Sequence, residues 1–317
     1  MYKKPDSLFT NLIPTTGLGR FFQFPIVRIF IALSFLFPVI LMNNLLGVGW
    51  LKYFDGYMEL AIRLLRDLFY LTLFMIAYSL YTRWVERRET LEFSFSKFTK
   101  ELGLGAILSF AVIGFMVALM MVLGYYKVEG FNEINILLTS FQKHMMVGFM
   151  EELLFRIILF KLVEEFAGSW WALVVQGILF GFAHLGNPNA SVWTSLGLVA
   201  DSTLLFAGAY MLTRRIWLVM GLHWSWNFLQ SGLFNMPNSG VDEPGFFKAI
   251  IAGPEWLTGG AFGIEASYLS ISLNVLIGLY LIKLAIDRGQ LVLPSWKRKN
   301  MNTETNLLEE FEDVNSI

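Results

Sequence analysis

Long apolar runs recur along the whole of this 317-residue chain, and they constrain its fold more than any other feature. Hydrophobic residues make up 56% of the sequence and charged residues only 15%, and the mean hydropathy is +0.56. About 20 consecutive apolar residues are enough for a helix to cross a bilayer. The sequence therefore predicts an all-α fold, that of a polytopic membrane protein in contact with the lipid bilayer.

We predict about eight transmembrane helices, with the catalytic core in helices 4–7. Their approximate ranges are 28–46, 59–81, 102–125, 137–163, 169–185, 190–212, 216–234 and 266–286. The acidic, Gly- and Pro-rich segment that begins at Pro237 is too broken to span, so we expect it at the membrane interface. Three parts result: a lead-in with three helices (1–135), a core (136–236), and the acidic segment with the last helix and a charged tail (237–317).

The placement of Lys and Arg predicts the orientation of these helices. Basic residues gather in the segments 83–100, 214–215 and 288–299, and eight spans put all three segments on one side, which the positive-inside rule assigns to the cytoplasm. The opposite side then carries the acids Asp242, Glu243, Glu255 and Glu265. We therefore expect an integral, multi-pass protein of a bacterial cell membrane with both termini in the cytoplasm.

Two features of the composition exclude classes of function. The net charge of −1 gives no reason to expect a nucleic-acid partner. The chain has no cysteine, which excludes disulfides, thiolate nucleophiles and Cys-ligated metals.

The stretch from His144 to Arg156, HMMVGFMEELLFR, places two adjacent carboxylates and an arginine in an otherwise apolar run. An ionised side chain at bilayer depth costs about 2.5–3.5 kcal/mol on insertion scales, so such groups pair with each other or take part in chemistry. Glu152 and Arg156 are four residues apart and share a helix face, which predicts an ion pair. Glu151 points about 100° away from Glu152. It is therefore left without a partner in its own helix.

Two further predicted spans carry polar residues at helical spacing. Phe180 and His184 are four residues apart in the fifth span, and His223 and Asn227 are four apart in the seventh. At about 1.5 Å per residue, Glu151, His184 and His223 lie within roughly 10 Å of one another in depth. Each alone is better explained as a contact between helices. An acid, two imidazoles and a carboxamide at similar depth together indicate an active site.

These residues form three motifs in order: Glu151-Glu152-x-x-x-Arg156, Phe180-x-x-x-His184 and His223-x-x-x-Asn227. The set resembles the CAAX-protease and bacteriocin-processing (CPBP, or Abi) family of intramembrane proteases, which are related to the eukaryotic type II CAAX prenyl endopeptidase. The resemblance covers roughly residues 140–235. It implies a glutamate-dependent endopeptidase with a helical core and a catalytic cavity inside the membrane.

The chemistry of peptide hydrolysis agrees with these residue types, because it needs an activated water, a general base and donors for the oxyanion. Glu151 is expected to be the base, and His184 to hold the same water and later protonate the leaving amine. His223 and Asn227 are expected to donate N–H groups to the oxyanion, and the resemblance assigns the same roles. Supporting roles are expected for Glu152, Arg156 and Phe180. The expected substrate is a membrane-associated protein or peptide.

Two other polar residues lie in predicted spans. Asp201, midway along the sixth span, is a functional hypothesis by default, as a partner of an active-site histidine or of Arg156. His144 lies seven residues before Glu151, on roughly the same helix face and about 10 Å away. For His144 we favour a structural role.

We expect the endopeptidase to need no cofactor and no metal ion. Three alternatives to this expectation remain open. Glu151, His184 and His223 are together a ligand set that suits zinc in a metalloprotease. The motifs could also belong to a non-catalytic membrane protein, such as an immunity factor or a scaffold. A secondary transporter is the third alternative, although the inverted repeats and broken helices of transporters are not seen in the sequence.

Overall fold

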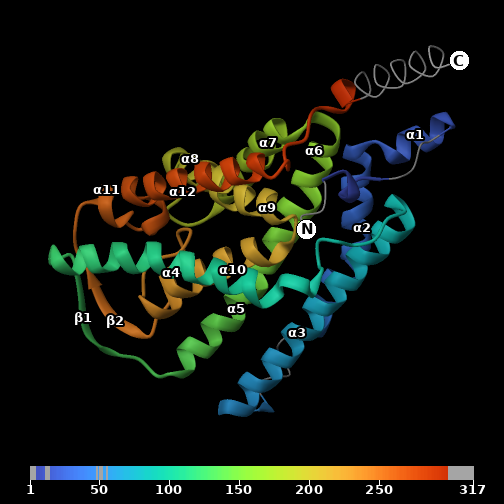
Figure 1. Cartoon of the computed structure of the whole chain (residues 1–317). Coiled ribbons are helices and arrows are strands. Elements are labelled where there is room, and N and C mark those ends of the chain that lie inside the picture. The colour runs from blue at the N-terminus through green and yellow to red at the C-terminus, as the bar shows by residue number, and fades with distance from the viewer. Residues whose placement is uncertain (1–4, 11–14, 48, 50–52, 55, 299–317) are drawn as a thin grey trace, which may run out of the picture.

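The computed structural model describes residues 5–10, 15–47, 49, 53–54 and 56–298, so most of the predicted charged tail lies outside the described residues. Helices dominate this part of the chain (Figure 1). The α-helices are α1 (Gly17–Gln23), α2 (Pro25–Leu46), α3 (Gly56–Tyr81), α4 (Phe98–Val122), α5 (Asn135–Glu152), α6 (Lys161–Ala167), α7 (Ser169–Ala183), α8 (Val192–Asp201), α9 (Ala207–Thr213), α10 (Ile216–Asn227), α11 (Glu255–Thr258) and α12 (Tyr268–Asp287).

Shorter turns of 3-10 or π helix join or extend these helices. They are η1 (Pro5–Leu8), η3 (Thr82–Glu86), η4 (Phe95–Lys97), η5 (Leu153–Phe160), η6 (His184–Gly186), η7 (Ser202–Phe206), η8 (Phe228–Leu233) and η9 (Ile264–Ala266). Because η5 joins α5 to α6 and η7 joins α8 to α9 without a break, each pair acts as one long helix.

The predicted all-α, polytopic membrane architecture is confirmed. Among the described residues, five helical segments are long and apolar enough to cross a membrane: Pro25–Leu46, Phe95–Val122, Ser169–Gly186, Val192–Thr213 and Tyr268–Asp287. The other three predicted spans, near 59–81, 137–163 and 216–234, are helical as well but carry ionisable residues. The total of eight spans and the three-part division stay predictions.

A small antiparallel sheet was not predicted from the sequence. Strands β1 (Tyr126–Phe131) and β2 (Phe247–Ile251) pair with Tyr126 opposite Ile251, and a β-bulge lies between Val128 and Gly130. The sheet lies at one end of the bundle, beside α11 (Figure 1). It ties the segment after Pro237 to the connection between α4 and α5.

Helix α10 is the centre of the bundle and packs against α4, α5 and α9. Glycines let α4 and α10 approach closely, as small residues do between membrane helices. A Cβ atom added at Gly105 would lie 2.6 Å from the backbone nitrogen of Leu222, and one at Gly221 would lie 3.0 Å from the carbonyl carbon of Leu102. The Ser109 hydroxyl also donates to the Leu222 carbonyl, at 2.7 Å. This contact fixes the position of the helix that carries His223 and Asn227.

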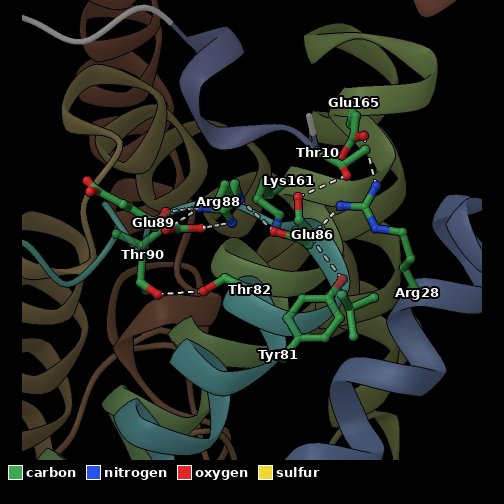
Figure 2. A network of polar contacts seen from close by, with 12 residues as sticks. Thr10, Arg28, Tyr81, Thr82, Glu86, Arg88, Glu89, Thr90, Lys161 and Glu165 are labelled. Atoms are coloured by element: carbon green, nitrogen blue, oxygen red, sulfur yellow. Dashed lines mark hydrogen bonds and ion pairs between the residues drawn. The ribbon is translucent and has the colours of Figure 1, made fainter. Parts of the chain in front are cut away.

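A buried ionic network attaches the first helices to the core at the opposite end of the bundle (Figure 2). Glu86, at the end of η3, accepts hydrogen bonds from Arg28 of α2, from Arg88 at 2.6 Å and from Lys161 of α6 at 2.6 Å. Arg28 also pairs with Glu165 at 2.8 Å. Burial opposes ionisation of Glu86, but Lys161, Arg88 and Arg28 outweigh it and hold the pKa of this carboxyl below its usual range. The network therefore joins α2, η3 and α6 through paired charges.

Candidate active site

Three long helices change from α to π geometry directly after a polar residue of interest. The π turns η5, η7 and η8 begin immediately after Glu152, Asp201 and Asn227. Such turns inside α-helices are often found at functional sites, because the extra residue re-aims the side chains around it. The three irregular places therefore mark where the helices face a common site.

These helices enclose a cavity of about 190 Å³. Its walls combine side chains from α5, α7, α8, α10 and α12 with side chains from the segment after Pro237. The predicted site residues that line it are Glu151, Phe180, His184, Asp201, His223 and Asn227. The convergence expected from helix depth is thus present in the structure.

Glu152 lies in the wall behind the cavity and binds two partners. Its Oε1 accepts a hydrogen bond from Arg156 at 2.9 Å, which is the predicted ion pair, and both side chains are fully buried. The same oxygen lies 2.6 Å from Nδ1 of His223. On the other side of the ring, Nε2 of His223 lies 3.6 Å from Oε2 of Glu151, whose side chain is 27% exposed. His223 is therefore held between the two glutamates, and only Glu151 is accessible from the cavity.

Arg156 is enclosed by groups that hold the plane of its guanidinium group in one orientation. One nitrogen donates to the Ser202 hydroxyl at 2.7 Å, and that hydroxyl donates to the Gln176 side chain at 3.1 Å. The guanidinium lies over the rings of Phe180 and Phe206, at 4.7 and 5.1 Å from their centroids. Cation–π contacts of this kind gain strength where water is excluded. Phe180 of the second motif thus supports the arginine of the first.

His184 ends α7 with a defined tautomer. Its Nδ1 lies 2.8 Å from the carbonyl oxygen of Phe180. Because a carbonyl only accepts, Nδ1 carries the proton, and Nε2 of the neutral ring is an acceptor. The ring also packs against that of Phe180, with centroids 4.7 Å apart. His184 is therefore arranged to accept a hydrogen bond from a group in the cavity.

Asn227 and His144 meet through Ser231. The Ser231 hydroxyl donates to the backbone carbonyl of Asn227 at 3.2 Å. It therefore accepts a hydrogen bond from Nε2 of His144 at 2.7 Å. This bond joins α5 to η8, in keeping with the structural role predicted for His144. The His144 side chain also lines the cavity, which the sequence did not indicate.

The partner predicted for Asp201 is corrected by the structure. Asp201 was expected to bind an active-site histidine or Arg156, but its Oδ2 accepts from the Asn274 amide of α12 at 3.2 Å. Arg156 instead reaches Ser202, the next residue along the chain. The π turn that starts at Ser202 explains the difference, because it changes which side chains of this helix face Arg156.

Several cavity residues were missed by the sequence reading. Glu265, directly before the last predicted span, accepts hydrogen bonds from the Gln230 amide and from the Ser239 backbone. Burial raises the pKa of the Glu265 carboxyl to about 7, although these hydrogen bonds act in the opposite direction. A single acid at the edge of an apolar run was the only sequence signal for this residue.

At the edge of the cavity, Lys143 of α5 forms an ion pair with Glu243 of the segment after Pro237, and both side chains are partly exposed. No spacing in the sequence connects two residues one hundred positions apart. The pair joins α5 to the segment after Pro237, which also lines the cavity.

The zinc alternative concerns the same side chains. Within the described ranges, no group of three or more His, Cys, Asp or Glu side chains is placed to hold a metal ion. Glu151 and His223 are close to each other, but Nδ1 of His223 is already occupied by Glu152. The absence of a metal requirement stays a prediction, for which the metal content of the protein is the test.

Comparison with known proteins bears on the motifs directly. Residues 133–229, less than a third of the chain, match the Rce1-like family, which is described as type II CAAX prenyl endopeptidase Rce1-like. No curated protein matches the chain, and no solved structure matches it. The matched range holds all three motifs and the helices α5, α7, α8 and α10, whereas α12 and the segment after Pro237, which also line the cavity, lie outside it. The match supports the CAAX-protease family for this part of the chain, and in general an endopeptidase of the CAAX-protease type.

Proposed function

We propose that this protein is an intramembrane endopeptidase that hydrolyses a peptide bond of a membrane-associated protein or peptide, with a water molecule activated by Glu151. One observation carries the proposal: Glu151, His184, His223 and Asn227, from three separate helical segments, line one cavity within the bundle. A base, two imidazoles and an amide donor around one enclosed space are what water-mediated attack on a carbonyl requires.

Glu151 is proposed as the general base because it alone of the two glutamates is accessible from the cavity. Glu152 is fully buried and occupied by Arg156 and His223. A water molecule beside Glu151 gives up one proton to the carboxylate as it attacks the carbonyl carbon. The protonated Glu151, or His184 once it has taken up a proton, then delivers that proton to the leaving amine.

His184 and Asn227 are proposed to position the reacting groups. The His184 tautomer leaves Nε2 as an acceptor, which can orient the attacking water. The Asn227 amide is a fixed donor for the oxyanion. Because Glu152 occupies Nδ1 of His223, Nε2 of this ring donates to the oxyanion when the ring is doubly protonated.

We further propose that the cavity opens toward the non-cytoplasmic side. Asn238, Ser239, Val241 and Glu243 line it, and the orientation predicted from Lys and Arg places their segment outside. The chain has no native cysteine, so single cysteines report on each side. A thiol reagent that cannot cross the membrane should label Asp242→Cys and not Lys97→Cys on intact cells. Labelling of Lys97→Cys alone contradicts this orientation.

The experiment that tests the activity compares variants in proteoliposomes with a library of internally quenched peptides. Glu151→Gln should abolish cleavage and keep the melting temperature. Asn227→Ala should cleave about 10²–10³ times more slowly, the usual effect of one lost oxyanion donor. Glu133→Gln is the matched control, since this exposed glutamate lies before α5 and outside the cavity. Cleavage by Glu151→Gln at the unmodified rate would refute the proposed role of Glu151.

A further inference from the structure

The cavity has a second polar part that the proposed reaction does not use. Asp201 of α8 and Asn274 of α12 both line it, with Glu265 of η9 beside them. Asp201 and Asn274 are almost fully buried, with exposed fractions of 3% and 1%. This group, which we call the acidic lobe, lies in the same cavity as Glu151 and His184.

The acidic lobe presents hydrogen-bond acceptors whose capacity is not used. The Asn274 amide donates to Oδ2 of Asp201 at 3.2 Å and to the Ser270 hydroxyl at 3.4 Å, so both of its hydrogens have partners. Oδ1 of Asp201 and Oδ1 of Asn274 are buried and have no hydrogen-bond partner among the described residues. Buried acceptors without partners cost free energy unless a water molecule or a ligand in the cavity supplies the missing donor.

A contact between helices does not require this arrangement. One oxygen of Asp201 is enough to hold Asn274, and an uncharged asparagine would make the same bond. An intramembrane acid with a free oxygen in a cavity is instead a typical feature of a binding site. The unused acceptors therefore indicate a donor group that enters from the cavity.

The charge of the cavity wall indicates which donor fits. The acids that line it are Glu151, Asp201, Glu243 and Glu265, against one lysine, Lys143. Lys143 is already paired with Glu243. Because Glu265 keeps its proton up to about pH 7, the preference for a positive charge rests on Glu151 and Asp201. A bound cation stabilises the ionised form of a carboxyl group, and low polarity around the pair strengthens their attraction.

We propose that the acidic lobe is a substrate subsite that binds a basic side chain, lysine or arginine, of the peptide to be cleaved. The inference rests on the proposed endopeptidase function, because the subsite opens into the same cavity as Glu151. The ammonium or guanidinium group donates to Oδ1 of Asp201 and to Oδ1 of Asn274. It thereby fixes the position of the neighbouring peptide bond relative to Glu151.

The test uses full-length protein and two sets of peptides that differ at one position. A positional library of internally quenched octapeptides first identifies the positions at which wild-type protein prefers lysine or arginine. Matched peptides with lysine or norleucine at that position then give kcat/KM for the wild type, Asp201→Asn, Asp201→Glu and Ser272→Ala. Ser272 is the control, because its exposed hydroxyl donates to the Tyr268 carbonyl of its own helix and does not line the cavity.

The wild type should prefer lysine on the order of ten- to a hundredfold, as expected for a buried charge pair. Asp201→Asn should bring this ratio close to one, while Asp201→Glu and Ser272→Ala should keep most of it. A wild type that cleaves peptides without any basic preference overturns the subsite. So does Asp201→Asn with an unchanged ratio.

A binding measurement separates this inference from the proposed activity. Fluorescence anisotropy with Glu151→Gln protein, and with peptide pairs that carry lysine or norleucine at each position in turn, reports the lysine preference without turnover. If no peptide is cleaved by the wild type but the lysine peptide binds more tightly, the proposed function fails and the subsite stands. If Asp201→Asn does not fold, equal binding of the two peptides to Glu151→Gln protein still overturns the subsite.

Discussion

Gly105→Ala tests whether the close contact between α4 and α10 determines the position of the active site. A Cβ atom at residue 105 would lie 2.6 Å from the Leu222 nitrogen and 2.8 Å from the Gly221 carbonyl carbon. Ordinary contacts of a Cβ atom lie at 3.4–4 Å, so the two helices must separate by close to 1 Å. The neighbouring atoms belong to the backbone of α10 and cannot move aside as a flexible side chain would.

The consequence should be larger for activity than for stability. Overpacking of this size destabilises a protein by about 1–3 kcal/mol. His223 follows Leu222 directly, so a shift of α10 carries its ring away from Glu151 and Glu152. A misplacement of about 1 Å can cost on the order of 10²-fold in rate. We therefore expect a modest loss of melting temperature in detergent and a loss of peptide cleavage of this order.

Gly103→Ala is the matched control, because a Cβ atom at residue 103 of the same helix meets no described atom within 4 Å. It makes the same chemical change without the clash and should retain both stability and activity. If Gly103→Ala and Gly105→Ala both keep peptide cleavage, or both lose it to the same extent, the claim that the contact at Gly105 positions α10 is refuted.

The remaining predictions concern the glutamates and the metal. Glu152→Gln should lower the stability by about 3–5 kcal/mol because it leaves Arg156 buried and unpaired. A Glu152→Gln protein that melts at the same temperature as the Glu151→Gln protein would contradict this. The folded protein holds a proton on Glu265 up to about pH 7, whereas the unfolded chain releases it near pH 4.5. Retention of this proton contributes roughly 3 kcal/mol at most to the free energy of unfolding; the contribution is present below pH 4.5 and is lost as the pH rises through 7. Glu265→Gln should therefore flatten the pH dependence of the melting temperature over this range. Active, never-chelated protein should contain no stoichiometric zinc, and zinc that tracks activity across preparations would overturn the metal-free mechanism.

The helical architecture could be predicted because the signals for it are local. Apolar runs of the length of a bilayer give the helices, and the spacing of Glu152 and Arg156 gives an ion pair that the structure contains. The similar depth of Glu151, His184 and His223 along their helices permitted a shared site, and the structure places all three at one cavity. Each of these inferences needs only spacings within the predicted helices.

The surroundings of the site could not be predicted because they depend on contacts between distant segments. Ser202 and Phe206 hold Arg156 from a helix whose π turn has no separate periodicity in the sequence. Asn274 lies in a largely apolar run with only Ser270 and Ser272 as nearby polar residues, and only the packing of α12 against α8 brings it to Asp201. The pairing of β1 and β2 likewise joins segments more than one hundred residues apart.

The two adjacent glutamates show how local pattern and packing combine. The twist of a helix separates their directions, so one can face the cavity while the other faces the core. The sequence assigned Glu152 to Arg156 alone, but its Oε1 also binds His223. Glu152 is thus a positioning residue for His223 as well as the counter-ion of Arg156. Its replacement should therefore impair both stability and activity, whereas replacement of Glu151 should impair activity alone.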